Sequence, residues 1–460
     1  MDRNALRIVA LAAALVASGC ALAPPPDAAQ LRDQSLPNTQ VPGQWTAAPT
    51  DPGPLVQGWL AQFQDPQLEK LVAEAMAYNP DLRIAAARVE AAEASARAAG
   101  AALFPQVNLG GHGGGKLGGD GSGVQGLGLF AAWELDLWGK LRAQRAAAGA
   151  QYESVALDTA YARESMAALV AKSWFLAREA AVQRALAGEM VTSSQALVDL
   201  SRERARVGRG DELEVSQAEA SALSYRDAQL QADIARQNAL RSIEILAGRY
   251  PSGTVDPGLA LPALPGPVPA GLPSELLERR PDVRAAERRV AAAFYRTEQA
   301  KAARLPTISL TAGISSITSD LFVMKERDNP VWSVGGTLLA PIFNAGALQA
   351  QVDVRTADQK AAVADYGRIG ARAFGEVEGA LSQSFNLDNR ADVLVRAVRA
   401  NENAVGYART RFEVGSGDLR GVQQQQLALH AARSTLARVQ GERLVQRVNL
   451  HLALGGGFAP

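Results

Sequence analysis

A tandem duplication constrains this 460-residue chain more than any other feature of its sequence. Two prolines near residue 100 recur about two hundred residues later at one constant separation of 201 positions: Pro80 matches Pro281, and Pro105 matches Pro306. A chance similarity rarely preserves the spacing of two such residues, and an internal repeat of this size determines the whole architecture. We therefore expect two structural units of similar design, each about 200 residues long.

The match continues downstream, where Val207-Gly208-Arg209-Gly210-Asp211 recurs as Val414-Gly415-Ser416-Gly417-Asp418. Glycine-rich pentapeptides of this kind predict a sharp turn between helices. We place the first repeat at residues 61–250 and the second at residues 274–460. The segment between them, residues 251–273, is rich in proline and predicts an irregular crossover linker.

The N-terminus has the pattern of an export signal. Arg3 and Arg7 flank a short apolar run that ends in small residues, so residues 1–19 predict a cleaved signal peptide. Cys20 is the only cysteine, which excludes an internal disulfide. The sequence around Cys20 resembles a bacterial lipobox, and this resemblance implies a lipid-anchored first residue and sorting to the outer membrane. Residues 20–60 lack a helical period and predict an extended segment along the surface.

Composition excludes some classes of protein. The formal net charge is +0 and charged residues make up 20% of the chain, so no electrostatic footprint for nucleic acid is present. After the signal peptide, no apolar run reaches the roughly 20 residues of a membrane-spanning helix. If the mature chain enters a membrane, we expect it to do so as strands.

Each repeat predicts one β-hairpin, at about residues 105–138 and 306–343. In the second repeat Ile308, Leu310, Ala312 and Ile314 alternate with polar residues, which is the period of a strand. Strands of about 9–11 residues are long enough to span a bilayer. Four candidate membrane strands therefore come from one chain.

A long helical hairpin follows each β-hairpin, at about residues 141–248 and 346–455. No proline occurs between Pro105 and Pro251, and the composition is rich in helix-forming residues. The first helix of each hairpin would reach roughly 100 Å if it were continuous. Apolar residues spaced seven apart favour coiled-coil packing between neighbouring helices.

Four strands cannot close a barrel, and open sheet edges in hydrocarbon leave backbone groups without hydrogen bonds. We therefore expect symmetric copies to close the sheet together, with their helices extending it as a tube. This arrangement predicts a conduit across the periplasm.

Several motifs then resemble the outer-membrane factor family, in its TolC/OprM lipoprotein branch: GWLAQFQDPQLEKLV, NPDLRIAAARV, WELDLWGK, LPSELLERRPDVRAAE and APIFNAG. The resemblance implies an α+β membrane protein that forms a homotrimer. It also implies a shared transmembrane barrel of twelve β-strands and a periplasmic barrel of twelve α-helices. The implied partners are a periplasmic adaptor, an inner-membrane pump and outer-membrane lipid of a Gram-negative cell, with export of drugs, organic compounds or metal ions as the function.

The resemblance also places a periplasmic gate just after the helix turns. The implied gate residues are Glu214 in the first repeat and Phe412, Gly417, Arg420, Gly421 and Gln424 in the second. Members of the family often carry acidic residues where this chain has Gly421 and Gln424. An acidic ring favours cations, so this departure removes the usual basis for cation selectivity. The run from Gln423 to Gln426 is equally consistent with a solvated helix face.

No catalytic, cofactor or metal site is predicted. Gly110 to Lys116 has the spacing of a phosphate loop, but Leu117 replaces the metal-binding Ser or Thr, so we expect a mobile hairpin tip. His112, His430 and His451 are scattered and lack zinc-site spacing. The charged residues around Arg280 stand at a predicted helix start, where capping and surface pairing explain them.

Three functions remain open on the sequence. The first is the passive exit channel of a tripartite efflux system, and the second is the exit channel of a type I protein-secretion system. The third is a lipid-anchored coiled-coil scaffold without a pore, which would have no use for membrane-spanning hairpins.

Overall fold

The computed structural model describes residues 23–47, 53, 57–113, 124–319 and 331–458. Two compact units are present, and each takes segments from both repeats. Unit 1 comprises Met1–Thr39, Ala86–Asp158 and Asp282–Gly370, and unit 2 comprises Gln40–Ala85, Thr159–Pro281 and Ala371–Pro460. The two repeats therefore do not fold as two separate domains. Each compact unit combines segments of the first repeat with segments of the second.

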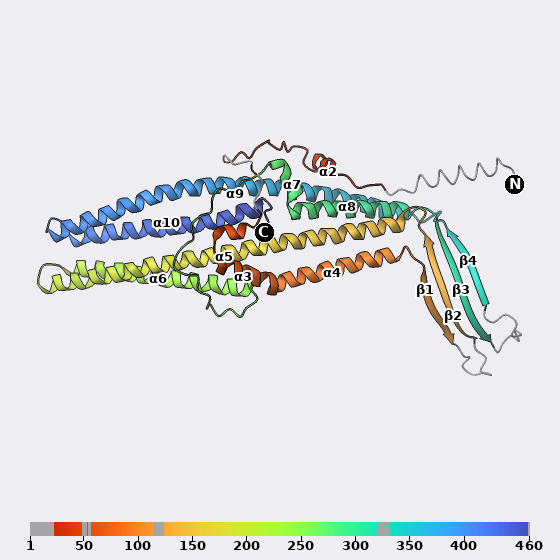
Figure 1. The fold of residues 1–460 in the computed structure, drawn as a ribbon, viewed down its shortest axis with the longest axis horizontal. Coiled ribbons are helices and arrows are strands. Elements are labelled where there is room, and N and C mark those ends of the chain that lie inside the picture. Colours follow the sequence, from red (N-terminus) through yellow and green to blue (C-terminus); the bar gives the residue numbers. More distant parts are fainter. Residues whose placement is uncertain (1–22, 48–52, 54–56, 114–123, 320–330, 459–460) are drawn as a thin grey trace. The chain divides into compact units, whose positions relative to one another are not determined.

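The elements in chain order (Figure 1) are α2 (Ala28–Ser35), η1 (Trp59–Phe63), α3 (Pro66–Tyr78), α4 (Pro80–Ala101), β1 (Gln106–Gly113), β2 (Val124–Leu135), α5 (Lys140–Arg206), α6 (Glu212–Leu246), η2 (Pro273–Glu275), α7 (Leu276–Arg279), α8 (Pro281–Ala302), β3 (Thr307–Ser319), β4 (Val331–Leu339), α9 (Ala347–Glu413) and α10 (Leu419–Ala453). The two 67-residue helices α5 and α9 contain no proline, which explains why they run unbroken. Across the described residues, no helix combines the length and the apolar character needed to cross a membrane.

One antiparallel sheet in unit 1 has the strand order β1-β2-β3-β4 (Figure 1). Each repeat contributes one hairpin, and the pairing of β2 with β3 joins the two repeats, with Leu129 opposite Ile314. The second hairpin starts at Thr307, close to its predicted start. Of the phosphate-loop-like run, Gly110 to Gly113 form part of β1, whereas the rest lies outside the described residues.

The two faces of this sheet differ in chemistry. Residues that pair across neighbouring strands share a face, and one set is apolar from edge to edge: Val107, Leu109, Leu127, Leu129, Ala131, Trp133, Ile308, Leu310, Ala312, Ile314, Trp332, Val334 and Leu338. The opposite face is mainly small and polar, with Asn108, Ser309, Thr311, Ser333 and Thr337. The ring of Phe130 also lies on that face and covers the glycines beside it.

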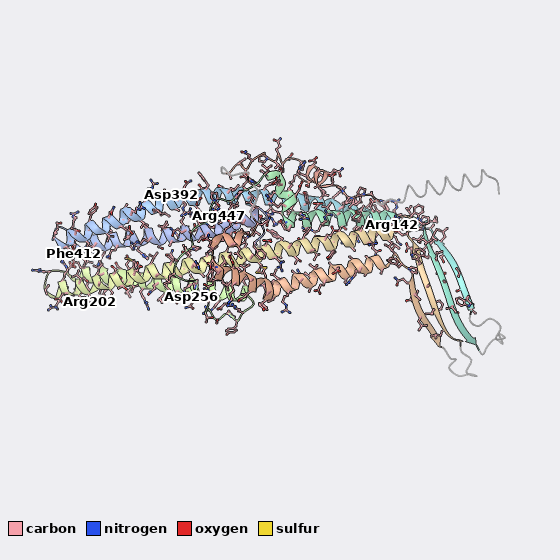
Figure 2. The ribbon with its side chains drawn as sticks, in the orientation of Figure 1. Arg142, Arg202, Asp256, Asp392, Phe412 and Arg447 are labelled. Carbon is pink, nitrogen blue, oxygen red and sulfur yellow. The ribbon has the colours of Figure 1, made fainter. Side chains whose placement is uncertain are left out.

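The sequence WELDLWGK connects the sheet to α5. The carboxylate of Asp136 accepts hydrogen bonds from the backbone N–H groups of Leu141 and Arg142 at 3.0 and 2.9 Å, so it caps the helix. The Arg142 guanidinium (labelled in Figure 2) also donates to Asp136 at 3.0 Å. Trp138 donates its indole N–H to the carbonyl oxygen of Pro306 at 2.6 Å. These contacts fix the exit of the first β-hairpin against the entry of the second.

The expectation of an extended N-terminal segment over residues 20–60 was wrong in part. Helix α2 begins after Asp27, whose side chain accepts the backbone N–H of Gln30 at 2.8 Å, while the Gln30 side chain accepts the backbone N–H of Asp27 at 3.1 Å. This reciprocal capping box forms a short helix without a long apolar period. A second turn, η1, follows at Trp59–Phe63. Cys20 lies outside the described residues.

The main core belongs to unit 2 and gathers aromatic side chains. Trp59, Phe63, Trp174 and Phe175 are buried together, and the Phe63 and Phe175 ring centres lie 4.8 Å apart. Asp65, which caps α3, accepts the Trp174 indole N–H at 2.8 Å. Burial of several aromatic rings on one cluster contributes a large apolar area, so this core holds the early helix α3 against α5.

Arg280 is not a surface residue, which corrects the interpretation that surface pairing explains it. Its side chain is fully buried and donates to the carbonyl oxygen of Ala453 at 3.0 Å. It also forms an ion pair with Glu376 at 2.7 Å and lies 5.7 Å from the centre of the Tyr161 ring. A buried cation requires such partners, and these come from distant parts of the chain. Its neighbour Arg279 does form a more exposed pair, with Glu275 at 3.7 Å.

The crossover linker is held by the carboxylate of Glu244, near the end of α6. It accepts the backbone N–H groups of Gly253 and Thr254 at 2.6 and 2.9 Å and the hydroxyl of Ser252 at 3.1 Å. Burial by itself would raise the pKa of Glu244, but these hydrogen bonds and one from Val255 lower that pKa below its ordinary value. The start of the linker is therefore tied to the end of α6.

Candidate functional site at the ends of the helical hairpins

Both helical hairpins of unit 2 turn in the same way. Gly208 follows α5 with φ +73°, and Gly415 follows α9 with φ +76°, a conformation that favours glycine. The N–H of Arg209 donates to the carbonyl oxygen of Arg204 at 2.8 Å, and that of Ser416 donates to Arg411 at 2.9 Å. This pattern is a Schellman motif, which satisfies the last carbonyl groups of each first helix.

An aspartate starts each return helix. Asp211 accepts the backbone N–H of Glu214 at 2.8 Å, and Asp418 accepts that of Gly421 at 2.8 Å. The repeated sequence V-G-x-G-D thus encodes a helix end, a turn and a helix start within five residues.

The second glycine of each turn is needed because the chain approaches itself closely. A Cβ atom at Gly417 would lie 3.2 Å from the Cβ of Arg411, and one at Gly210 would lie 3.2 Å from the Cβ of Arg204. Both distances are tighter than ordinary carbon contacts. Gly417, predicted as a gate residue, therefore shapes the turn.

Arg204 links the two hairpin ends. Its Nε atom lies 3.6 Å from Oε2 of Glu214, and it donates to the carbonyl oxygen of Arg209 at 3.0 Å. Its guanidinium carbon lies 5.4 Å from the centre of the Phe412 ring, at the end of α9 (labelled in Figure 2). The structure thus brings two predicted gate residues, Glu214 and Phe412, together through an arginine of the first hairpin.

The remaining predicted gate residues lie at the start of α10. Arg420 and Gln424 are exposed, while Gly421 is half-buried. Gln426, in contrast, is buried, and its side chain donates to the Ser193 hydroxyl of α5 at 3.1 Å. The glutamine run is therefore not uniformly solvated.

Further polar contacts join the hairpins behind their ends. Ser434 donates to the side chain of Gln183 at 2.7 Å, and Gln183 donates back to the Ser434 carbonyl oxygen at 2.8 Å. The rings of Tyr225 and His430 meet edge-on at 5.2 Å. Burial lowers the pKa of His430 below its ordinary value. Polar pairs of this kind set the register between helices.

Sequence reasoning missed Arg204 and its counterpart Arg411. The signal was present, because the two arginines stand at the same separation as the V-G-x-G-D turns.

Among the described residues, no group of three His, Cys, Asp or Glu side chains could hold a metal ion. The arrangement at the hairpin ends holds two helical hairpins in contact through Arg204 and Phe412 and through Gln426 and Ser193.

Comparisons with known proteins match most of this chain. The sequence profile of the outer membrane efflux protein family matches residues 71–249 and 272–456. The chain is 31% identical to the cation efflux system protein CusC of Escherichia coli O6:H1, over 98% of this chain and 99% of that protein. It is also 31% identical to the pyoverdine export outer membrane protein OpmQ of Pseudomonas aeruginosa, over 91% of each chain.

A solved structure gives the same result. The outer-membrane channel OprN aligns with a TM-score of 0.85 and 29% identity, over 92% of this chain and 98% of that chain. The predicted fold class, a duplicated protomer with long helices and four strands of an outer-membrane channel, is confirmed.

Proposed function

Since this chain belongs to the outer membrane efflux protein family, we propose that it is the exit channel of a tripartite efflux system and passively conducts its cargo across the outer membrane. In this role the channel receives small organic compounds or ions from an inner-membrane pump through a periplasmic adaptor. The family assignment supports the location and the transport class, and the resemblance of the motifs supports the tripartite arrangement.

The observation that carries the proposal is the four-stranded sheet of unit 1. Its apolar face suits contact with lipid, and its small, polar face suits a water-filled lumen. Within the described residues β1 and β4 are the edge strands, and each leaves one row of backbone groups unpaired. Pairing of β4 with β1 of the next copy would satisfy both rows, so several copies must close the sheet together.

Three copies are proposed on the family resemblance, which gives twelve strands and twelve long helices. Cys20 is the proposed lipid attachment point, so that each copy is anchored in the outer membrane by an acyl chain as well as by its strands. The closed ring satisfies the symmetry expected of identical subunits.

The gate is proposed at the hairpin ends. Arg204, which pairs with Glu214 of its own hairpin, contacts Phe412 of the second hairpin, and this contact favours a closed end. Arg420 and Gln424 are exposed at the start of α10 and are proposed to face the constriction. A lumen lined in this way carries no fitted pocket, which agrees with relatives whose names refer to cargoes as different as cations and pyoverdine.

The decisive experiment is single-channel recording of the purified full-length protein in a planar bilayer. We expect a small, mostly closed conductance that rises when Arg420→Ala removes a cation from the constriction. Arg399→Ala removes an exposed arginine of α9 far from the hairpin end and serves as the matched control. A conductance that Arg420→Ala leaves unchanged would move the gate elsewhere. Folded, inserted protein without any conductance would contradict the channel.

A further inference from the structure

The two hairpin ends share the same turn and the same helix cap, but they differ at the position three residues after that cap. Arg204 and Arg411 occupy the same place before the turn, and Asp211 and Asp418 cap the return helices in the same way. Three residues after that cap the first end has Glu214, which neutralises Arg204, whereas the second end has a glycine. Comparison of the two repeats therefore shows that Arg411 has no carboxylate at the position where Glu214 pairs with Arg204.

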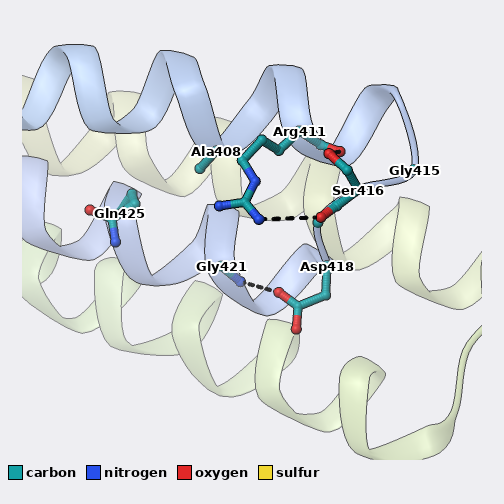
Figure 3. A pocket seen from close by; sticks show the side chains of 8 residues that line it. Ala408, Arg411, Gly415, Ser416, Asp418, Gly421 and Gln425 are labelled. Carbon is teal, nitrogen blue, oxygen red and sulfur yellow. Dashed lines mark hydrogen bonds between the residues drawn. The ribbon is translucent and has the colours of Figure 1, made fainter.

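The missing side chain leaves space. Arg411 borders a cavity of about 600 Å³ that Gly415, Gly417 and Gly421 also line (Figure 3). Its guanidinium donates to the carbonyl oxygen of Ser416 at 3.5 Å, and no ion pair joins it to a carboxylate in the described part of the chain. The nearby carboxylate of Asp418 accepts the backbone N–H of Gly421 (Figure 3).

The aromatic contact of Arg204 has no counterpart at the equivalent position of the other hairpin. Within one copy, Arg204 of the first hairpin lies over Phe412 of the second. In the proposed ring, the second hairpin adjoins the first hairpin of the next copy, and the residue there that corresponds to Phe412 is Ala205. At that position Arg411 would therefore find no aromatic ring of the kind that Arg204 contacts.

We propose that the cavity at Arg411 is a docking site for an acidic side chain of the periplasmic adaptor, with one such site in each copy of the channel. The inference rests on the proposed function, because it assumes that an adaptor meets this end of the channel. A guanidinium binds a carboxylate with two parallel hydrogen bonds, which gives both strength and orientation. The first hairpin end offers no equivalent site, because Glu214 already fills it.

The glycines favour a protein as the occupant. Gly415 and Gly417 carry no side chain at the rim, so the backbone of a second polypeptide can approach closely. A Cβ added at Gly421 would meet only Oδ1 of Asp418, at 3.1 Å, so the space above Gly421 is otherwise open. An acidic side chain entering from outside would reach the position that Glu214 occupies in the first repeat.

The test uses the full-length channel in cells that express its own partners, with a photo-cross-linking amino acid in place of Gln425 at the cavity wall. The cross-linked peptide is mapped by mass spectrometry. We expect it to come from a periplasmic protein and to contain Asp or Glu. Arg411→Gln should lower the yield about tenfold, since glutamine cannot form the charged, two-bond contact with a carboxylate that a guanidinium forms.

Gly421→Glu is the sharper variant, because it adds the carboxylate that the first repeat already has. It should fill the cavity, pair with Arg411 and lower the cross-linking yield to a similar extent without removing any group. Arg409→Gln, which removes a neighbouring exposed arginine outside the cavity, should leave the yield unchanged. Native electrophoresis of each variant shows whether the assembly is intact.

A charge exchange completes the test. Arg411→Glu should abolish the cross-link, and replacing the mapped acidic residue of the partner by Arg should restore it.

Unchanged cross-linking in both Arg411→Gln and Gly421→Glu would overturn the proposal, as would a cross-link that maps only to a second copy of this chain. If the Arg411 variants change the ratio of anion to cation conductance but not the cross-link, the site binds free anions and no docking occurs. A conducting channel with unchanged cross-links refutes the docking site alone, whereas a folded chain without conductance refutes the channel.

Discussion

The guanidinium of Arg204 lies 5.4 Å from the centre of the Phe412 ring, and this contact connects the ends of two hairpins that arose by duplication. The same arginine is paired with Glu214. One side chain thus holds an intra-hairpin ion pair and an inter-hairpin cation–π contact. Any movement that separates the hairpins must break the second contact.

Arg204→Ala is therefore expected to favour the open channel. The contact with Phe412 is the one that crosses between the hairpins, and a cation–π contact at a partly exposed site contributes about 0.5–1 kcal/mol. The ratio of open to closed states should rise several-fold, as measured by single-channel open probability. Arg202→Ala, which removes the pair with Glu219 inside the first hairpin, is the control and should have little effect.

The contact itself is isolated by a double-mutant cycle. Phe412→Leu keeps an apolar side chain but removes the aromatic face. If Arg204 and Phe412 interact as the structure indicates, the effect of the double variant on open probability will be smaller than the sum of the two single effects. Additive effects would show that each residue acts independently.

The burial of Arg280 predicts that replacing it lowers the folding free energy much more than replacing its neighbour Arg279. Arg280→Ala removes a fully buried cation that is bonded to Ala453 and Glu376, and we expect a loss of roughly 3 kcal/mol of folding free energy. Arg279→Ala removes the longer and more exposed pair with Glu275 and should cost less than about 1 kcal/mol. Thermal unfolding followed by helical circular dichroism measures both. Equal shifts would contradict the structural role of Arg280.

His451 predicts a dependence of stability on pH. Its ring is buried and stacked at 5.7 Å on Trp59, and burial together with the positive charge of Arg447 lowers its pKa to about 3. Because this pKa is lower in the folded chain than in the unfolded chain, the contribution to stability is fully present above about pH 6.5. It is lost progressively as the pH falls toward about 3.

His451→Phe keeps a stacked ring and removes the titration. Each unit of pKa shift corresponds to about 1.4 kcal/mol, so the variant should remain folded at acidic pH values where the natural chain loses several kcal/mol. At pH 8 the two should be equally stable, or the variant slightly more so, because neither ring nitrogen has a hydrogen-bond partner in the described residues. Parallel pH profiles for the two proteins would exclude His451 as the titrating group.

The long helices, the strands and the repeats could be predicted because each depends on a local pattern in the sequence. The two long helices follow from the absence of proline and from helix-forming composition, and strand β3 follows from the alternation at Ile308 to Ile314. The equivalence of the repeats follows from the spacing of prolines and glycines alone. All of these signals lie within short stretches of sequence, where backbone chemistry decides the outcome.

The tertiary partners could not be predicted in the same way. The local sequence shows only that Arg280 lies at a helix start. Its buried contacts are with Ala453 and Glu376, which are far away in the chain. The pairing of Arg204 with Phe412 likewise depends on how two hairpins pack. Helix α2 was missed for a different reason: the capping pair of Asp27 and Gln30 was present in the sequence but was outweighed by the lack of apolar periodicity.

The proposed lipid anchor is tested at Cys20. Cys20→Ser should abolish incorporation of radiolabelled palmitate, because a hydroxyl group cannot replace the thiol in forming the acylated N-terminus. Ser18→Ala, which keeps a small residue in the lipobox-like sequence, should retain the label. Labelling that persists in Cys20→Ser would exclude this cysteine as the attachment point.

Gln424, at the start of α10, is the residue that we propose to influence the ion selectivity of the gate. Gln424 is exposed and uncharged, so the constriction as proposed carries no acidic ring. Gln424→Asp would add one carboxylate per copy, and clustered carboxylates attract cations and repel anions. We expect the ratio of cation to anion permeability in bilayer recordings to rise by about two- to five-fold at 0.1 M salt. The rise should shrink at 1 M salt, where the screening length falls from about 10 Å to about 3 Å.

Asn403→Asp adds the same charge on an exposed part of α9 away from the turn and should change the permeability ratio little. Equal effects of the two variants would mean that Gln424 does not line the constriction.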